Sequence, residues 1–175
     1  MEFEGGAIAN VFGHVIARDS SFLANAAGLR GGAISSKGVL FPDQLGILEV
    51  ERSEFTLNSV PAVANAIGGA IYDHAYAYLT DVDFENNHAP DGAGVYAEEY
   101  PIQVTRCLFR DNPAGASGQG GGIRSSGANV TVTNSTFAGN TALNGGGIHL
   151  STADGTVTNS TFAGNSASGQ GANLS

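Results

Sequence analysis

The sequence is short of several residue types, and each shortage limits what the chain can be. There is no tryptophan and a single cysteine, Cys107, so no disulfide can form within the chain. Charged residues make up 13% of the chain, about half the usual share in a soluble domain. No apolar run approaches the ~18 residues that a membrane-spanning helix needs. The first residues lack the basic start and apolar segment of a signal peptide, so we expect none in this chain.

Basic residues are the scarcest charged group, with 7 lysines and arginines against 16 acidic residues and a net charge of −9. A nucleic-acid partner requires a basic face, and so does adsorption to an anionic membrane. We therefore expect neither partner, and we interpret the acidic surface as a means of keeping the protein soluble.

Glycine, in contrast, is abundant, with 26 of the 175 residues. Much of it lies in a recurring word, G-G-[A/G]-[I/V], with a degenerate last copy at 171–174. The copies occupy residues 5–8, 31–34, 68–71, 92–95, 120–123 and 145–148.

A second word, F-x-x-N, alternates with the first. Its phenylalanines are spaced by 33, 29, 25, 28 and 25 residues, a repeat length typical of solenoid proteins. The phenylalanine and asparagine pairs are Phe22/Asn25, Phe55/Asn58, Phe84/Asn87, Phe109/Asn112, Phe137/Asn140 and Phe162/Asn165.

The residues before each phenylalanine alternate as in a β-strand. Positions seven, five and two before it are apolar or small, whereas the positions between them are mostly polar. Alternation of this kind turns the apolar side chains inward. The step from minus five to minus two breaks the period by one residue, so we expect a bend or bulge there.

No stretch shows a helical pattern with caps, so each repeat must hold strands and turns only. A coil of ~25 residues with three strands and three corners is typical of the right-handed parallel β-helix, whose coils lie ~4.8 Å apart. We predict an all-β, right-handed, single-stranded parallel β-helix of about six to seven coils. Residues 1–175 would form one domain, as a segment of a longer solenoid or a stacking unit.

The repeated words predict specific contacts between coils. Phenylalanine at one inward position predicts a continuous aromatic stack, and asparagine three residues later predicts a ladder of bonded amides. We expect that asparagine to adopt the left-handed conformation at a corner. The paired glycines would supply positive φ and let neighbouring coils approach closely.

Charges alternate three residues before phenylalanine, in the order Asp19, Arg52, Asp81, Arg106. We expect a structural ladder in which each side chain meets the opposite charge above and below.

Extra residues interrupt the repeat in three places, and loops of this sort often carry the binding sites of solenoids. The first insertion is apolar at its tip. The insertions are Ser36–Gly46, with Val39, Leu40, Phe41 and Leu45 at the tip, Ser59–Ile67 and Pro113–Gln119.

Glu54 and Asp83 each precede a phenylalanine in consecutive coils, which would stack them roughly 5 Å apart. Two carboxylates at that separation suit a retaining glycosidase or a Ca²⁺ site. We favour a solvated acidic face, with Arg52 and Arg106 near enough to neutralise it. The sequence therefore predicts no catalytic, cofactor-binding or metal-binding residue, and Glu54 and Asp83 are the candidates if the chain is an enzyme.

Two other reactive residue types give no sign of a site. The four histidines show none of the paired spacings of zinc ligands. Cys107 stands in an inward column, so we expect a buried, inert thiol.

The alternating G-G-A-[I/V/L] and F-x-x-N words resemble the repeats of the polymorphic outer-membrane proteins of chlamydiae. The resemblance covers nearly the whole chain, and it implies the passenger of an autotransporter, exposed at the cell surface, with some members acting as adhesins. The signal peptide and the membrane barrel of that family are absent here, and no catalytic motif carries over.

The function we expect is therefore an extracellular or cell-surface structural or adhesive β-solenoid without catalysis, whose ligand is a host surface or a polysaccharide. The alternative is a carbohydrate-binding or polysaccharide-cleaving β-helix of the pectate-lyase kind. A cleft of carboxylates and a basic residue under the Ser36–Gly46 loop would favour the alternative. Neither end of the chain shows a capping helix or charge cluster, so we also expect end-to-end stacking, which would give a fibre.

Overall fold

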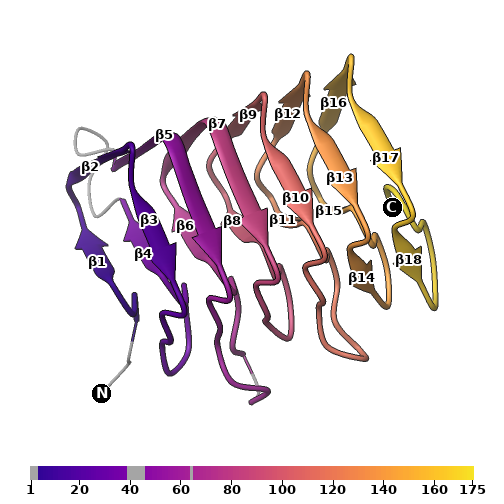
Figure 1. The fold of residues 1–175 in the computed structure, drawn as a ribbon, viewed down its shortest axis with the longest axis horizontal. Coiled ribbons are helices and arrows are strands. Elements are labelled where there is room, and N and C mark those ends of the chain that lie inside the picture. Colours follow the sequence, from indigo (N-terminus) through magenta and orange to yellow (C-terminus); the bar gives the residue numbers. More distant parts are fainter. Residues whose placement is uncertain (1–3, 39–45, 64) are drawn as a thin grey trace.

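The protein is a β-solenoid made only of strands, turns and loops in the part of the chain that the structure describes (Figure 1). This computed structural model describes residues 4–38, 46–63 and 65–175. Strands from successive coils pair in parallel and in register. Within the described residues no helix is suited to crossing a membrane. The predicted all-β parallel solenoid is confirmed.

One face of the solenoid is a six-stranded parallel sheet, the first sheet, and each of its strands begins at the isoleucine or valine of a glycine word. Five turns join these six strands, so the prediction of six to seven coils was slightly too high. The last glycine word forms only an isolated bridge from Leu174 to Ile148. The strands are β1 (Ile8–Val11), β4 (Ile34–Lys37), β6 (Ile71–His74), β8 (Val95–Glu98), β11 (Ile123–Ser126) and β15 (Ile148–Ser151).

The remaining two walls belong to one ten-stranded sheet, the second sheet, which bends along its length. A small separate pair is formed by β14 (Thr141–Ala142) and β18 (Ser166–Ala167). The strands of the second sheet are β2 (His14–Arg18), β3 (Ser21–Leu23), β5 (Ile47–Thr56), β7 (Tyr76–Glu85), β9 (Ile102–Thr105), β10 (Leu108–Arg110), β12 (Val130–Thr133), β13 (Thr136–Ala138), β16 (Gly155–Thr158) and β17 (Thr161–Ala163).

The bend lies where the strand period breaks, three residues before phenylalanine. Asp19, Arg52, Asp81 and Arg106 adopt left-handed φ values of 50°, 45°, 55° and 53° there. That residue and the one before it both face outward, so the alternation shifts by one residue, and the positions five and two before phenylalanine, for example Val50 and Ser53, both face the core. The expected bend is confirmed.

Phenylalanine side chains stack through the core, as the second word predicts. Ring centroids of neighbouring coils lie 4.5–5.0 Å apart with interplanar angles of 1–12°. Four of the rings are completely buried: Phe55, Phe84, Phe109 and Phe137. Each inner ring therefore contacts an identical neighbour on both faces.

Asparagine forms the predicted ladder beside the rings. Asn87 Nδ2 donates to Asn112 Oδ1 at 3.0 Å and to the Phe55 carbonyl at 2.9 Å, and the same bonds recur between successive coils. The expected left-handed asparagine is wrong, because the residue before it takes that conformation, for example Leu57 (φ 58°). The corner thus turns one residue earlier, which leaves the asparagine amide free to point along the stack.

The glycine words work as predicted. Gly31 has a φ of 58°, in the left-handed region, and a Cβ on Gly32 would overlap the carbonyl oxygen of Gly69 in the next coil. The close approach of the coils at Gly32 therefore requires a glycine there.

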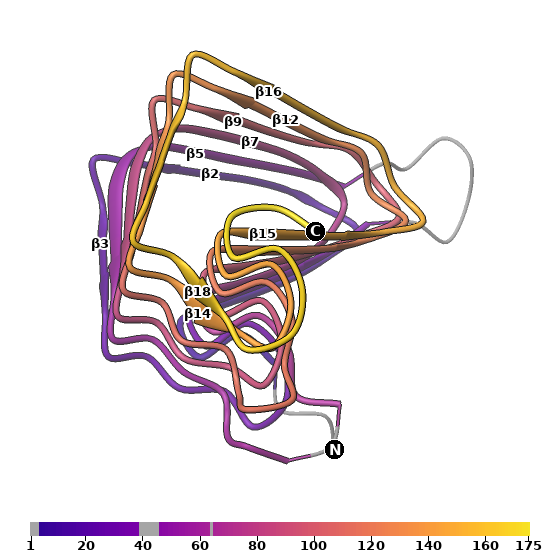
Figure 2. The same cartoon turned by 90° about the vertical axis from the view of Figure 1, so that its right-hand side faces the viewer.

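Viewed along its axis, the solenoid has protruding arms beneath the first sheet (Figure 2). The arms are the segments that follow each F-x-x-N word and lead into the next glycine word, in the described residues 26–31, 59–63, 65–68, 88–92, 113–120 and 141–145. Each arm meets the outer face of the first sheet at an inside corner, and this corner runs along the molecule.

Candidate functional site

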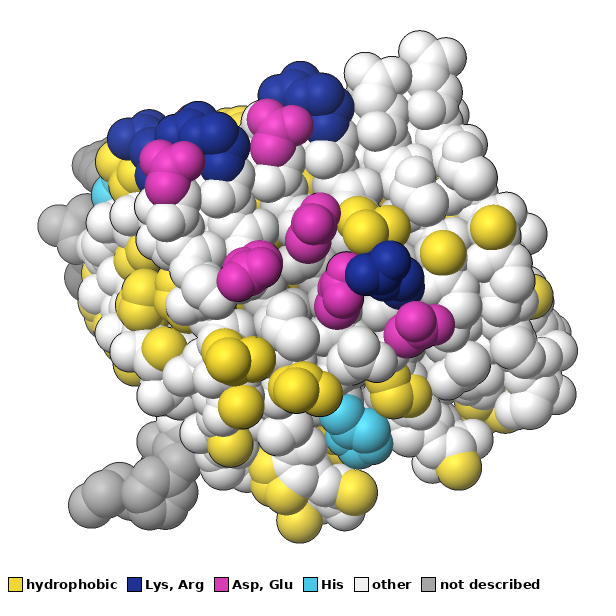
Figure 3. Space-filling view, in the orientation of Figure 1, with side chains coloured by type: hydrophobic (Ala, Val, Ile, Leu, Met, Phe, Trp, Pro, Cys, Tyr) yellow, Lys and Arg dark blue, Asp and Glu magenta, His cyan; other side chains and the backbone are white. Residues whose placement is uncertain are grey.

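Glu54 and Asp83 lie side by side on the outer face of the second sheet, where β5 and β7 pair them in register. Both side chains are exposed, on an open surface that carries further acidic groups (Figure 3). Burial raises the pKa of Asp83, the Glu85 carboxylate two residues along the same strand raises it further, and the stacked Glu54 contributes least. The predicted stacking is therefore present, while a catalytic role of this pair stays untested.

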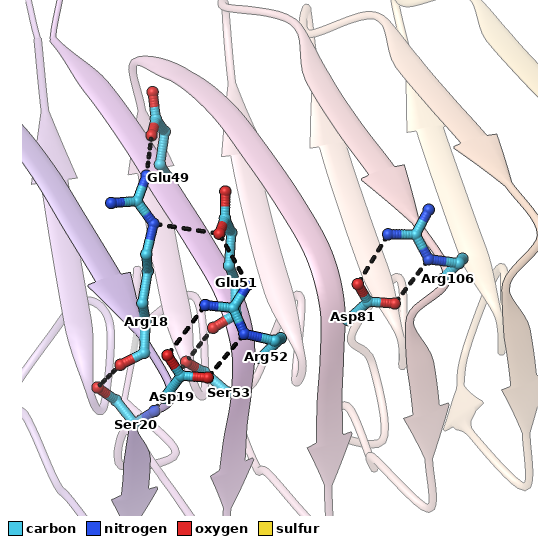
Figure 4. Close-up of polar contacts among 9 residues, drawn as sticks. All are labelled: Arg18, Asp19, Ser20, Glu49, Glu51, Arg52, Ser53, Asp81 and Arg106. Atoms are coloured by element: carbon cyan, nitrogen blue, oxygen red, sulfur yellow. Dashed lines mark hydrogen bonds and ion pairs between the residues drawn. The ribbon is translucent and has the colours of Figure 1, made fainter.

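Arg52 and Arg106 do not neutralise that pair but bind acidic residues at the bend (Figure 4). Arg52 donates two hydrogen bonds to Asp19 at 2.7 and 2.9 Å, and Arg106 donates two to Asp81, both at 2.7 Å. The arginine that lowers the pKa of Asp83 is instead Arg110, which forms an ion pair with Glu85.

The charge ladder is thus built of pairs rather than of a continuous chain. Arg52 turns its remaining nitrogen to Glu51 at 3.1 Å and acts on Asp81 only through space. The hydrogen bonds from arginine lower the pKa of Asp19 and of Asp81. These fork-shaped ion pairs explain the alternating charges without a ligand.

In the described residues, no group of three or more His, Cys, Asp or Glu side chains is arranged so that it could hold a metal ion. His14 and His74 each pair with a glutamate of the next coil, Glu49 at 3.2 Å and Glu99 at 3.1 Å. Cys107 is buried, and burial raises its pKa to about 12, so its thiol is the inert one expected.

The three insertions differ in what the structure shows. Val39, Leu40, Phe41 and Leu45 of the Ser36–Gly46 insertion lie outside the described residues, so the cleft that would favour the carbohydrate alternative is not tested there. The other two insertions face each other across the Pro90 turn, and their residues line a shallow hollow of about 390 Å³.

A second hollow, the arm groove, lies in the inside corner between the arms and β8. Its volume is about 430 Å³. Backbone bridges from Arg30 to Ile67 and from Ile67 to Asp91 hold one wall together across three coils. The lining residues are Leu29, Arg30, Asn65, Ile67, Asp91, Tyr96 and Glu98.

The floor of the arm groove is made by outward side chains of the first sheet. Tyr96 directly follows the valine of its glycine word, and Tyr72 holds the same place one coil earlier. Tyr72 is only 2% exposed, because the Arg30 guanidinium lies over its ring at 5.1 Å from the centroid. Its hydroxyl donates to Glu98 Oε2 at 2.5 Å, and burial raises the pKa of Tyr72. Tyr72 therefore fills the corner in its coil, whereas Tyr96 is left half-buried and open to the groove.

The charged side chains of the groove each form a hydrogen bond to another group of the protein. The backbone N–H of Gln119 donates to Asp91 Oδ1 at 2.7 Å, and the Tyr72 hydroxyl donates to Glu98. Arg30 donates to Glu4 at 3.1 Å. A side chain fixed by a bond outside the site is already oriented before a ligand arrives, which lowers the cost of binding.

Two further polar residues continue the corner beyond the groove. Arg124 and His149 occupy the position of Tyr96 in the following coils. Burial lowers the pKa of both, and the Arg124 charge lowers that of His149 further. Two tyrosines, an arginine and a histidine thus follow one another along a single line.

Sequence reasoning missed this groove because it aligned the repeats on phenylalanine, which orders the second sheet. The available signal was the residue after each glycine word, read as Ser35, Tyr72, Tyr96, Arg124 and His149.

Comparison with known proteins identifies the fold family. The family model described as right-handed β-helix region matches residues 6–167. Searches of curated proteins and of solved structures each found no match. The match concerns the general β-helix and not the chlamydial repeats that the two words resemble. Because it spans most of the chain, the protein belongs to the right-handed β-helix family.

Proposed function

We propose that this protein is an extracellular or cell-surface β-solenoid with a structural and adhesive role, which binds a glycan in the arm groove without cleaving it. The observation that carries the proposal is the groove itself. It combines a half-buried tyrosine ring, two carboxylates and a guanidinium around one hollow. Aromatic rings flanked by a few fixed polar groups are what a site for a sugar requires.

The arrangement of the carboxylates supports binding rather than catalysis. Glu54 and Asp83 stand on an open face, where water has access from every side, whereas catalysis of glycoside cleavage depends on an enclosed substrate. In the arm groove, Glu98 already accepts the Tyr72 hydroxyl. The surface location rests on the resemblance of the repeat words to those of autotransporter passengers.

End-to-end association remains part of the proposal. In the last coil, Val157 is 39% exposed and Phe162 is incompletely covered, although their counterparts Val132 and Phe137 are fully buried. Further coils placed there, from this polypeptide or from a second copy, would continue both columns. Sedimentation over a concentration series tests this point, and a strictly monomeric chain at high concentration would contradict stacking of copies.

A glycan array with the purified chain tests the proposed function. We expect binding that Tyr96→Ala abolishes and that Tyr78→Ala, which removes a tyrosine from the second sheet, leaves unchanged. The bound glycans are then incubated with the protein and assayed for new reducing ends. Cleavage that disappears in Glu54→Gln would replace the adhesive proposal by the polysaccharide-cleaving alternative.

A further inference from the structure

The hollow between the two later insertions, the insertion hollow, adjoins the arm groove. Asn65 and Asp91 line both of them. A ligand in the arm groove can therefore extend into the insertion hollow along a surface that the protein already provides. The other side chains around the insertion hollow are apolar except for that of Ser117, and they belong to Ala62, Val63, Ala66, Pro90 and Ala116.

Backbone hydrogen bonds hold the walls of the insertion hollow in shape. On one side, the Ala66 N–H donates to the Val63 carbonyl at 3.2 Å. On the other side, the Gly118 N–H donates to the Gly115 carbonyl at 2.7 Å. The Gly115 N–H donates in turn to the Pro90 carbonyl at 3.1 Å, which ties the later insertion to the Pro90 turn. The hollow is thus formed before a ligand arrives, as most small-molecule sites are.

Asn65 supplies a neutral polar group where the two hollows meet. The residue is exposed, and its φ of 65° lies in the left-handed region. Within the part of the chain that the structure describes, its carboxamide forms no hydrogen bond. A carboxamide has an acceptor oxygen and two N–H donors, so it can accept from the N–H and donate to the C=O of another amide at once.

The charges of the arm groove compensate one another. The Arg30 guanidinium lines the groove together with the Asp91 and Glu98 carboxylates. Arg124 lies beside Tyr96 in register, and burial lowers the pKa of Arg124, which Tyr96 and Asp91 partly offset. Because both signs of charge are present, the site selects neither a cation nor an anion, and the ligand that it fits is neutral.

We infer that the arm groove and the insertion hollow together bind a neutral glycan chain with N-acetylated hexosamine units. A sugar ring of the chain lies on Tyr96, an acetamido group pairs with the Asn65 carboxamide, and the methyl of that group enters the insertion hollow. This inference rests on the proposed function and is narrower, because a glycan without acetamido groups satisfies the proposed function alone.

Isothermal titration of the whole chain with three tetrasaccharides tests the inference. They are chitotetraose, cellotetraose and fully deacetylated chitotetraose, which differ only in one substituent of each ring. We expect chitotetraose to bind at least about tenfold more tightly than cellotetraose, because a buried methyl group contributes about fourfold and an amide hydrogen bond about fivefold. The deacetylated tetramer, which lacks both contacts, should bind no more tightly than cellotetraose.

Two substitutions separate the acetamido contacts from the rest of the groove. Asn65→Gly removes the carboxamide and keeps the left-handed backbone, which glycine tolerates. Ala116→Leu fills the insertion hollow from an exposed position. Each should lower the affinity for chitotetraose at least about fourfold and leave that for cellotetraose unchanged.

Asn134→Gly is the matched control, because Asn134 is also an exposed asparagine with left-handed φ but lies at the bend of the second sheet. It should change neither affinity. Far-UV circular dichroism and melting curves verify that each variant is folded.

The outcomes separate the inference from the proposed function. Equal binding of chitotetraose and cellotetraose, both lost in Tyr96→Ala, would overturn the inference and keep a glycan-binding groove. A preference for chitotetraose that survives both Asn65→Gly and Ala116→Leu would also overturn it, as would tighter binding of the deacetylated tetramer. Absence of binding to any oligosaccharide, in the array and in titration, would overturn the inference and the proposed function together.

Discussion

After Arg124 the chain carries one charged residue, Asp154, whereas the coils before it carry all the others. Figure 3 shows the result, because the acidic and basic side chains of this face lie over the coils that precede β12. The interiors of the two regions are nevertheless alike. Phe55 and Phe137 are both completely buried in the same stack, and Asn58 and Asn140 occupy the same ladder. The repeat thus fixes the interior of every coil and leaves its surface free to vary.

The difference in surface explains where a site can form. In the coils up to Arg124, insertions and arms of unequal length surround tyrosines and carboxylates, and both hollows described above lie there. In the coils beyond it, threonines stack in register on β12 and β16, for example Thr131 on Thr156 and Thr133 on Thr158. Because threonine is a good strand former, we interpret the surface of these coils as structural.

The largest expected effect tests whether the two interiors are equivalent. We expect Phe55→Ala and Phe137→Ala to lower the free energy of unfolding by similar amounts, about 3–5 kcal/mol, because each removes a ring stacked on both faces. Thr133→Ala, on the outer face, should cost less than about 1 kcal/mol. Denaturant midpoints measure all three. A much smaller loss for Phe137→Ala would show that the uncharged coils are packed less tightly.

The asparagine ladder gives a smaller effect that should depend on position. Asn112→Ala removes an amide that bonds to Asn87, Asn140 and the Phe84 carbonyl, and buried partners would be left unsatisfied. We expect a loss of about 1–3 kcal/mol. Asn165→Ala, at the last rung, should cost less, because water reaches its partners. Equal losses in urea titrations would contradict this ranking.

Asp73 should make stability depend on pH. Asp73 is completely buried, and burial raises its pKa. The backbone N–H of Ala75 lowers the pKa in part, although neither carboxylate oxygen accepts a hydrogen bond of good geometry. Below the pKa of the unfolded chain both states are protonated and stability is greatest. As pH rises above it, the unfolded state ionises first, so the free energy of unfolding falls by about 1.4 kcal/mol per pH unit until the folded pKa is reached.

Asp73→Asn removes this titration while keeping the size of the side chain. We expect the variant to be more stable than the parent at neutral pH and to lose the difference as the pH falls to the pKa of the unfolded carboxyl, about 3.9. Melting temperatures from acid to neutral pH provide the measurement. Parallel pH curves for the two proteins would mean that the Asp73 carboxylate is stabilised as an ion.

The exposed ion pairs at the bend should matter least. Arg106→Gln breaks the two bonds to Asp81, both of which lie at the surface. Water solvates such charges well, so the loss of stability should be no larger than that of Thr133→Ala. It should be smaller still in high salt. A loss as large as that of Asn112→Ala, measured in the same titration, would give the ladder a stabilising role that we do not assign to it.

The fold was predictable because its signal is repeated. Each copy of the two words shows the same inward column, so register errors at one insertion are corrected by the next coil. The Phe22 to Phe162 stack, the asparagine ladder and the bend at Arg52 all followed from that alignment. The left-handed residue was misplaced because asparagine tolerates that conformation well, whereas here its hydrogen bonds to two coils require an ordinary one.

The arm groove was not predictable in the same way. Tyr96 and Glu98 belong to one strand, but Asp91 and Arg30 reach the groove from arms whose lengths differ from coil to coil. The contacts between arm residues and strand residues depend on the path of each arm. No repeated position in the sequence predicts that path. The burial of Asp73 was equally hidden, because its counterparts Ser36 and Ala97 suggest no charge at that place.

The most direct test of the shared interior is solution NMR of contacts between coils. The structure predicts backbone contacts in a parallel, in-register pattern, between Val104 and Val132 and again between Val132 and Val157. It also predicts ring contacts from Phe109 to Phe137. Finding these contacts on both sides of Arg124 would support one solenoid with two different surfaces. An antiparallel pattern, or contacts that end at β11, would contradict it.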